Sequence, residues 1–345
     1  MARIKDVAKL AGVSIASVSR YLNSPELLKK ETAEAIRKAI ETLDYRPSPL
    51  AASMRTRKTN TIAFVIPSLT NLYYVDMHTY MHKECKERGY ILNLYTTEYD
   101  DKALVQYLND IPTRQYDGVI ISHLDEEHVT GVLNEVQEKI PLVLITADPN
   151  KTQFTHVFID AMDGIFKATN HLIELGKKRI AFAGGGESSH ISSKEKYKGF
   201  KLAMERANLA IEPGYVFTGM KNHFHTGFMA ARQFITQPVV PDAIVCSTDD
   251  VAMGCIKYLL MNGYRVPDDV AVIGFNGISI VDSFEPAIST VVQPMEMMVK
   301  SAIELLLETI KNKNRKRKKK AAFTSTLKIG TSTVKDAQVG FQFEI

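Results

Sequence analysis

Residues 4–23 read IKDVAKLAGVSIASVSRYLN, a pattern that predicts two short helices joined by a tight turn. Val7, Ala8 and Val18 are spaced to meet between the two helices, and Gly12 supplies the turn. The outer face of the second helix keeps short polar residues and one arginine, namely Ser14, Ser17, Ser19 and Arg20. A hairpin that only packs inside an enzyme rarely keeps so polar a face. We therefore predict a helix-turn-helix whose second helix enters a DNA major groove.

Positive charge is concentrated at two places in this chain of 345 residues. Residues 1–60 carry 12 Lys and Arg against 6 Asp and Glu, and the run KNKNRKRKKK at 311–320 carries 8 basic side chains and no acidic ones. The remainder has 23 basic and 33 acidic side chains, so a polyanion should bind the N-terminal part. We expect 311–320 to be a solvated surface loop, with non-specific attraction to DNA or RNA as the alternative.

Composition excludes several classes of protein. No apolar run approaches the roughly 18 residues of a membrane-spanning helix, and no hydrophobic stretch of a secretory signal follows Arg3 and Lys5. Cys85, Cys246 and Cys255 are odd in number and too widely spaced for a disulfide framework or a metal site. We expect a cytoplasmic protein of two or three domains that has no membrane segment, metal or cofactor.

Further predicted helices at 31–43 and 50–55 precede a long alternation of strands and helices. Strands are expected at 62–67, 91–96, 118–122, 142–146, 156–159, 179–184, 216–219, 243–247, 270–275 and 327–330. Helices are expected at 74–89, 101–110, 126–138, 163–175, 194–208, 226–235, 250–262 and 293–307. The fold class is therefore α/β, with two doubly wound, parallel-sheet lobes and a cleft between them behind an all-α headpiece.

An enzymatic function is not expected. Gly184, Gly185 and Gly186 follow a strand, but they lack the Lys-Ser/Thr ending of a phosphate loop and the spacing of a dinucleotide site. No His-Glu zinc motif or nucleophile elbow occurs in the sequence. A turn at the strand end accounts for the three glycines.

The N-terminal residues 1–61 resemble the DNA-binding headpiece of the lactose-repressor (LacI/GalR) family of transcription regulators, and the likeness extends over nearly the whole chain. It is carried by Ile4–Ala8, Ala11–Ser14, Ser17–Arg20, Leu22, Asn23, Thr32, Ala33, Ile36, Leu43, Tyr45–Pro47 and Ala51. The resemblance implies a helix-turn-helix headpiece at 1–46, a hinge helix and linker at 47–60, and an effector-binding and dimerisation domain at 61–345. That domain has the two-lobed architecture of periplasmic binding proteins, with lobe one at 62–161 plus 292–321 and lobe two at 162–290 plus 322–340. A plain binding protein of the periplasmic type is the alternative, against which the headpiece argues.

The resemblance assigns base reading to Ile15, Ala16 and Arg20. An arginine there can bond guanine O6 and N7, with a phosphate contact as the alternative. The other assigned DNA contacts are Ser14, Ser17, Asn23 and, in the hinge, Leu50, Ser53 and Met54. Met54 stands where the family usually has Leu, and it is apolar and long enough to wedge into the minor groove. The expected partner is a palindromic double-stranded operator with a central CG step, bound by a homodimer.

The family holds sugar hydroxyls with Arg, Asn and Asp at three positions, where this sequence has Lys196, Thr248 and Asn276. A point charge and an amide do not replace the guanidinium and carboxylate that grip vicinal hydroxyls. The other candidates near strand ends are Ser68, Asn71, Tyr73, Tyr74, Asp160, His190, Ser192 and Asn222, with His223 and His225 nearby. These residues favour a carbohydrate-type effector, including a sugar acid or sugar phosphate. The alternative is a structural Asp160 and exposed loop histidines.

The resemblance thus implies a repressor of carbohydrate-utilisation genes that a sugar, sugar acid or sugar phosphate switches from the cleft. The alternative is a catabolite-control-type regulator, whose switch is a phosphorylated partner protein. That branch of the family similarly has Lys and Thr at the positions of Lys196 and Thr248.

Overall fold

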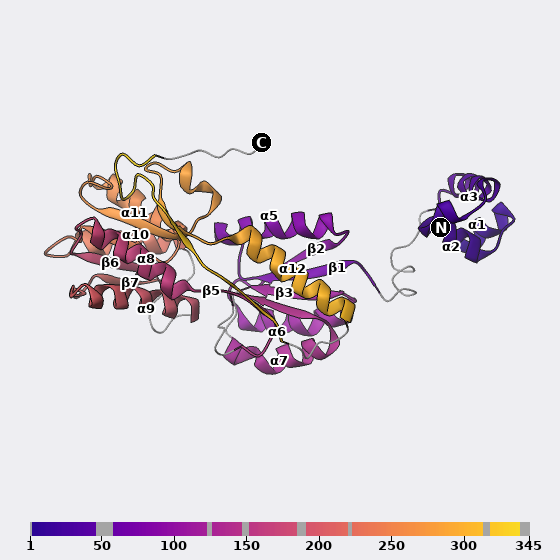
Figure 1. Ribbon diagram of the computed structural model, residues 1–345, viewed down its shortest axis with the longest axis horizontal. Helices are drawn as coiled ribbons and strands as arrows, with labels where there is room; N and C mark the ends of the chain where they lie inside the picture. Colours follow the sequence, from indigo (N-terminus) through magenta and orange to yellow (C-terminus); the bar gives the residue numbers. More distant parts are fainter. Residues whose placement is uncertain are drawn as a thin grey trace. The chain divides into compact units, whose positions relative to one another are not determined.

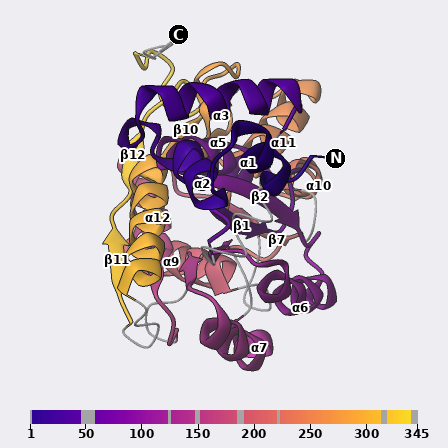
Figure 2. The ribbon, with the colours of Figure 1, turned by 90° about the vertical axis from the view of Figure 1, so that its right-hand side faces the viewer.

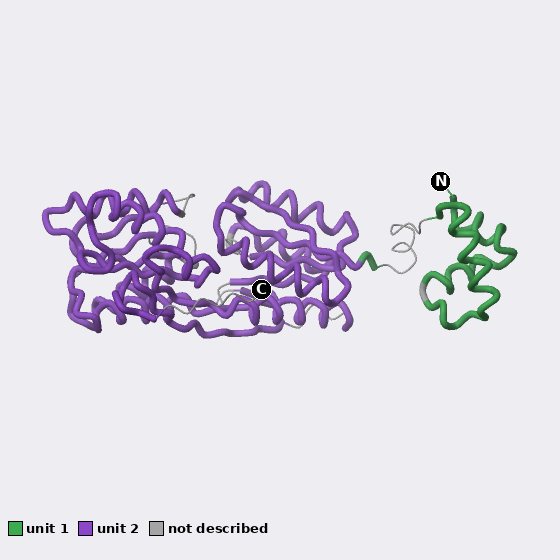
Figure 3. The backbone as a smooth tube through the Cα atoms, turned by 90° about the horizontal axis from the view of Figure 1, so that it is seen from above, with its two compact units in different colours: residues 1–59 green, residues 60–345 purple. Residues whose placement is uncertain are grey.

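The computed structural model describes residues 2–45, 58–122, 126–146, 152–184, 191–219, 223–312 and 318–338. They form two compact units, one ending at Thr59 and the other beginning at Asn60 (Figure 3). The predicted hinge helix at 50–55, with Leu50, Ser53 and Met54, lies outside the described residues.

The first unit is a small helical domain. It contains α1 (Ile4–Ala11), α2 (Ile15–Asn23), the short 3-10 helix η1 (Pro25–Leu27) and α3 (Lys30–Thr42). The core of this unit joins all three α-helices and consists of Val7, Ala8, Val18, Ile36 and Ala39. The helical spacing of these residues predicted both the helices and the core that they share.

The second unit holds two six-stranded sheets (Figure 1). The first sheet has the order β11-β5-β4-β3-β1-β2, from β1 (Thr61–Ile66), β2 (Ile91–Thr96), β3 (Gly118–Ser122), β4 (Leu142–Ile145), β5 (His156–Ile159) and β11 (Lys320–Phe323). The second has the order β12-β10-β9-β8-β6-β7, from β6 (Ile180–Gly184), β7 (Val216–Thr218), β8 (Ala243–Cys246), β9 (Ala271–Asn276), β10 (Ser289–Val292) and β12 (Thr326–Lys328). Neighbouring strands are parallel except β10 and β12. The predicted α/β class with two parallel-sheet lobes is confirmed.

Helices cover both faces of each sheet. In lobe one, α5 (Leu72–Glu87) and α12 (Met295–Asn312) lie on one face, and α6 (Asp101–Asp110) and α7 (Glu126–Lys139) on the other (Figure 1). In lobe two, α8 (Ala161–Glu174) and α9 (Ile191–Arg206) lie opposite α10 (His223–Ile235) and α11 (Asp249–Met261). Short 3-10 helices lie at Ile111–Arg114 (η2) and Ser279–Asp282 (η3). The strands are apolar on both faces because successive side chains point to opposite helical layers.

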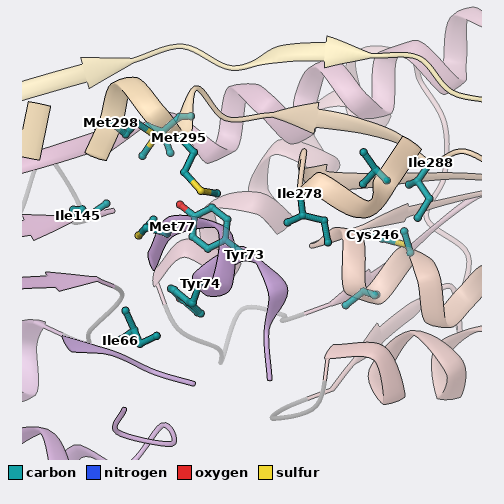
Figure 4. Packing of buried hydrophobic residues seen from close by; sticks show 14 of the residues in the cluster. Ile66, Tyr73, Tyr74, Met77, Ile145, Cys246, Ile278, Ile288, Met295 and Met298 are labelled. Atoms are coloured by element: carbon teal, nitrogen blue, oxygen red, sulfur yellow. The ribbon is translucent and has the colours of Figure 1, made fainter. Parts of the chain in front are cut away.

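The two lobes share one apolar core along the α5, α12, α10 and α11 side. Tyr73 and Met77 of α5, Met295 of α12, and Ile278 and Ile288 of lobe two belong to the same cluster (Figure 4). The chain passes between the sheets after β5, after β10 and after β11. Lobe one and lobe two are therefore joined by side-chain packing as well as by three crossing segments of the chain.

Two strands at the crossings were not predicted, and they move the predicted lobe boundaries by two residues. β10 extends lobe two to Val292, and β11 extends lobe one to Phe323. The basic run 311–320 is not a loop throughout, because α12 ends at Asn312 and β11 begins at Lys320, beside α12 (Figure 2). β11 is an edge strand with alternating exposed and half-buried residues. Lysine is common on such edges, where it opposes pairing with other chains, so the charge run concealed the strand.

Candidate DNA-reading helix and interlobe site

The turn between α1 and α2 depends on the backbone of Gly12. This residue has a φ of +65°, and nothing lies within 4 Å of the position that a Cβ would take. The glycine is therefore required for its left-handed conformation and not for space. The turn brings Val18 of α2 against Val7 and Ala8 of α1, and all three are buried as predicted.

The opposite face of α2 is open. Ser14, Ile15, Ala16 and Arg20 are exposed, and Ile15 is 52% exposed although it is a large aliphatic residue. Ser14 caps the helix, since its Oγ accepts a hydrogen bond of 3.1 Å from the backbone N–H of Ser17. The exposed apolar side chain of Ile15 and the guanidinium of Arg20, five residues later, give α2 one group for a thymine methyl and one for a guanine. The Asn23 side chain lies outside what the structure describes.

The interlobe site is the set of buried polar residues at the strand ends between the two lobes. Seven predicted effector contacts are buried there: Ser68, Asn71, Tyr73, Tyr74, Lys196, Thr248 and Asn276. Their convergence follows from the fold, because the carboxyl ends of parallel strands meet at one edge of a sheet. Among the other candidates, Asp160 is exposed and caps α8 by accepting from the Asp163 N–H at 2.9 Å. Asp160 therefore has the structural role that was the alternative to effector binding. His190, Asn222 and the side chain of Ser192 lie outside the described residues.

Two of the buried residues also start helices. Asn71 Oδ1 accepts from the Tyr73 N–H at 3.0 Å, and Thr248 Oγ1 accepts from the Val251 N–H at 3.3 Å. These caps begin α5 and α11 before the predicted starts at 74 and 250. A side chain that caps a helix has fewer atoms left for a ligand, so Thr248 offers less than its position suggests.

A chain of hydrogen bonds joins the two lobes. The Tyr73 hydroxyl of α5 donates to Gln293 Oε1 at 3.2 Å, and Gln293 Nε2 donates to Asn276 Oδ1 at the end of β9 at 2.8 Å. A second contact joins Asp76 of α5 to Ser279, whose N–H and Oγ reach the carboxylate at 2.7 and 2.9 Å. Any change in the angle between the lobes must break or re-form these bonds. Gln293 was not predicted, since it lies in a crossing segment without a recognisable motif.

Lys196 is turned into lobe two. Its Nζ donates to the Ser247 carbonyl at 2.8 Å and lies 4.1 Å from the centre of the Phe275 ring. Burial lowers the pKa of Lys196 to about 7, and the negative charge of Asp249 partly opposes that shift. The side chain is therefore bound within the protein, and burial disfavours its charged form, so it holds an anion weakly.

Asp249 and Asp250, which follow β8, were missed by sequence reasoning. Asp249 is fully buried and its carboxylate is satisfied, because it accepts from the Thr290 hydroxyl and, at 2.9 Å, from the Ile278 N–H. Asp250 is only 5% exposed, and its Oδ2 has no hydrogen-bond partner among the described residues. Two adjacent carboxylates directly after a buried strand were the signal that could have identified them.

Asp250→Asn is expected to raise the free energy of unfolding near neutral pH by up to about 3 kcal/mol. Burial raises the pKa of Asp250 to about 6, while the backbone N–H groups of Leu72 and Asp250 lower it. The folded state therefore binds more protons than the unfolded state between about pH 4 and 6, and stability falls as the pH rises through this range. Urea unfolding near pH 7.5 and near pH 5 should show an advantage for the variant that shrinks at the lower pH. An advantage that is equal at both values would contradict the account.

The chain is similar to bacterial regulators over both units. Residues 3–48 match the lacI family of bacterial regulatory proteins, and residues 169–333 match the periplasmic binding protein-like domain. The HTH-type transcriptional repressor PurR of Haemophilus influenzae (strain PittEE) is 32% identical over 315 residues, covering 91% of this chain and 93% of PurR. PurR of Vibrio campbellii is 32% identical over 321 residues, covering 92% and 95%.

Solved structures of regulators resemble the whole chain. The transcriptional regulator CelR in complex with cellobiose is 26% identical, with a TM-score of 0.70 over 96% of this chain and 100% of CelR. The Lac repressor dimer bound to operator and the anti-inducer ONPF has a TM-score of 0.85 over 96% of this chain and 99% of its own, at 20% identity. None of the described helices is long and apolar enough to cross a membrane, and the described residues contain no cluster of three metal-ligating side chains. The open face of α2, the two parallel-sheet lobes and these likenesses show that the chain belongs to the lacI family and is a DNA-binding transcriptional repressor, not an enzyme.

Proposed function

We propose that the protein binds a palindromic operator as a homodimer and that a carbohydrate-type effector between the lobes controls its affinity for DNA. The observation that carries the first part is the exposed pair of Ile15 and Arg20 on the outer face of a helix whose other face is packed. The predicted hinge residue Met54 would enter the minor groove at a central CG step. The relatives support this reading by their names as repressors, and the Lac repressor structure by its bound operator.

The bonds between the lobes support the second part of the proposal. Tyr73, Gln293 and Asn276 link α5 to the end of β9, so a ligand that binds among them changes the relative stability of two lobe positions. A ligand with different affinities for two states shifts their populations. β1 of lobe one follows the headpiece in the chain after the predicted hinge helix and linker at 47–60, so a lobe movement would alter the spacing of two headpieces in a dimer.

The operator arm of the proposal is tested with full-length protein and duplexes selected from random sequence. We expect the selected site to be symmetric, with two protomers bound per duplex in sedimentation experiments. Removing one half-site should weaken binding at least about 100-fold, since the second half-site acts at high effective concentration. Equal affinity for one and two half-sites at the same salt concentration would refute the dimeric reading.

The effector arm is tested by the operator affinity in the presence of sugars, sugar acids and sugar phosphates. A compound that stabilises the protein by its mass-action contribution should also change the operator affinity. The catabolite-control alternative gains support because Lys196 and Thr248 are both engaged within lobe two. It predicts instead that small molecules leave operator affinity unchanged and that a phosphorylated protein partner alters it.

A further inference from the structure

Asp250 is a buried acid whose carboxylate takes no part in the hydrogen bonds described above for the interlobe site. It lies in the first turn of α11 and is 5% exposed. Within the part of the chain that the structure describes, its Oδ2 has no hydrogen-bond partner. A buried carboxylate with an unpaired oxygen is costly unless a donor or a cation compensates it.

The groups around Asp250 come from the opposite lobe. The backbone N–H of Leu72, at the start of α5, hydrogen bonds to the carboxylate. Burial raises the pKa of Tyr99, which follows β2 and hydrogen bonds to the Asn71 side chain, and the charge of Asp250 raises it further. Tyr74 interacts electrostatically with Tyr99 in turn, and its ring packs against Tyr73 at 5.2 Å.

Lys196, the buried cation among the predicted effector contacts, is already engaged by groups of the protein. Lys196 donates to the Ser247 carbonyl and lies over the Phe275 ring, and the carboxylate with which it interacts is that of Asp249. An anionic ligand would consequently meet the unpaired carboxylate of Asp250 without a free ammonium to offset it. The charges of the described residues therefore favour a cationic ligand over an anionic one.

We propose that the interlobe site takes a small polar ligand with a protonated amine, and that the amine donates to Asp250 Oδ2. This inference rests on the proposed function, which places the effector between the lobes. An ammonium group gains a charge-assisted hydrogen bond from the carboxylate. A sugar phosphate or sugar acid gains no such bond.

The test uses the full-length protein and matched probes that differ in one group. The pairs are D-glucosamine with D-glucose, D-galactosamine with D-galactose, and putrescine with 1,4-butanediol; gluconate and glucose 6-phosphate are the anionic probes. Calorimetry and thermal shift give the affinity ratio within each pair. We expect at least one amine to bind about 10- to 100-fold more tightly than its hydroxyl partner, and the anions to bind most weakly.

Asp250→Asn keeps the shape of the side chain and removes its charge, so it should abolish the preference for the amine. Asp76→Asn is the comparison variant, since Asp76 is also an interlobe acid whose charge acts on Asp250, but both of its oxygens are occupied by Ser279. The preference within each pair should decrease much less in that variant than in Asp250→Asn, even if all affinities change together.

The inference is overturned by tighter binding of the anionic probes, by a preference that survives in Asp250→Asn, or by the failure of every amine to bind. These results differ from failure of the proposed function. An anionic probe that binds and changes operator affinity would preserve the proposed function while excluding the amine. Operator affinity that no small molecule alters would contradict the proposed function itself.

Discussion

Arg20→Ala is expected to remove the discrimination between operator and random DNA while the headpiece stays folded. Arg20 is exposed on the open face of α2, whereas the core of the headpiece lies on the other side around Val18. A bidentate arginine–guanine contact contributes about 1–3 kcal/mol of discrimination, and a dimer uses it twice. The operator affinity should therefore fall about 100-fold or more, and non-specific affinity only by the loss of one charge per protomer.

Arg37→Ala is the matched control for this experiment. It removes the same charge from an exposed arginine of the headpiece, but Arg37 lies on α3 and pairs with Glu34 and Glu41 at 2.5 and 3.0 Å. The quantity to compare is the ratio of specific to non-specific dissociation constants at one salt concentration. A ratio that drops equally in both variants would show that Arg20 contacts phosphate and does not read a base.

Gly254→Ala is expected to produce the largest loss of stability, about 3 kcal/mol or more. Gly254 of α11 lies against the backbone of α10, and a Cβ on it would overlap the carbonyl oxygen of Phe224. Gly227 of α10 faces α11 in the same way, where a Cβ would overlap the carbonyl oxygen of Val251. Because both neighbours are backbone atoms, the helices would have to separate, and the buried packing around Cys255 would be lost.

Gly131→Ala provides the control for the expected loss. Gly131 lies in α7, is exposed, and has no atom within 4 Å of the place where the alanine Cβ would stand. Alanine should stabilise that helix by up to about 1 kcal/mol, since glycine loses more backbone entropy on folding. Urea unfolding of both variants should give changes of opposite sign, and a similar small effect of the two substitutions would disprove the close contact of α10 with α11.

The local parts of the molecule were predictable because their causes are local. Gly12 marks a left-handed turn, and Val7 and Val18 recur at helical spacing, so the hairpin could be predicted from neighbouring residues alone. The strands of both lobes were predictable for the same reason, as continuous apolar runs are typical of sheets that are buried on both faces. β10 and β11 escaped prediction because their strand conformation depends on partners distant in the chain, Ala271–Asn276 and His156–Ile159.

The residues of the interlobe site also differ in whether local sequence or distant contacts determine their roles. The sequence predicted that Asn71, Tyr73 and Asn276 follow strands, and the structure buries all three. It did not reveal Gln293 or Asp250, whose contacts come from the other lobe. The Asp160 carboxylate, by contrast, bonds only three residues away, to the Asp163 N–H, and the cap at the start of α8 is a local feature.

The sequence alone determined that this chain carries a DNA-reading hairpin ahead of two α/β lobes, since turn chemistry and hydrophobic spacing act between near neighbours. Tertiary structure decided the electrostatics of the interlobe site. Lys196 is a cation in the sequence, but burial against Ser247 and Phe275 takes it out of water and lowers its pKa to about 7. Asp250 is one acid among many in the sequence, and only the approach of α5 leaves one of its oxygens buried without a partner in the described chain. Charge depends on solvation, and solvation is set by segments that meet only when the chain has folded.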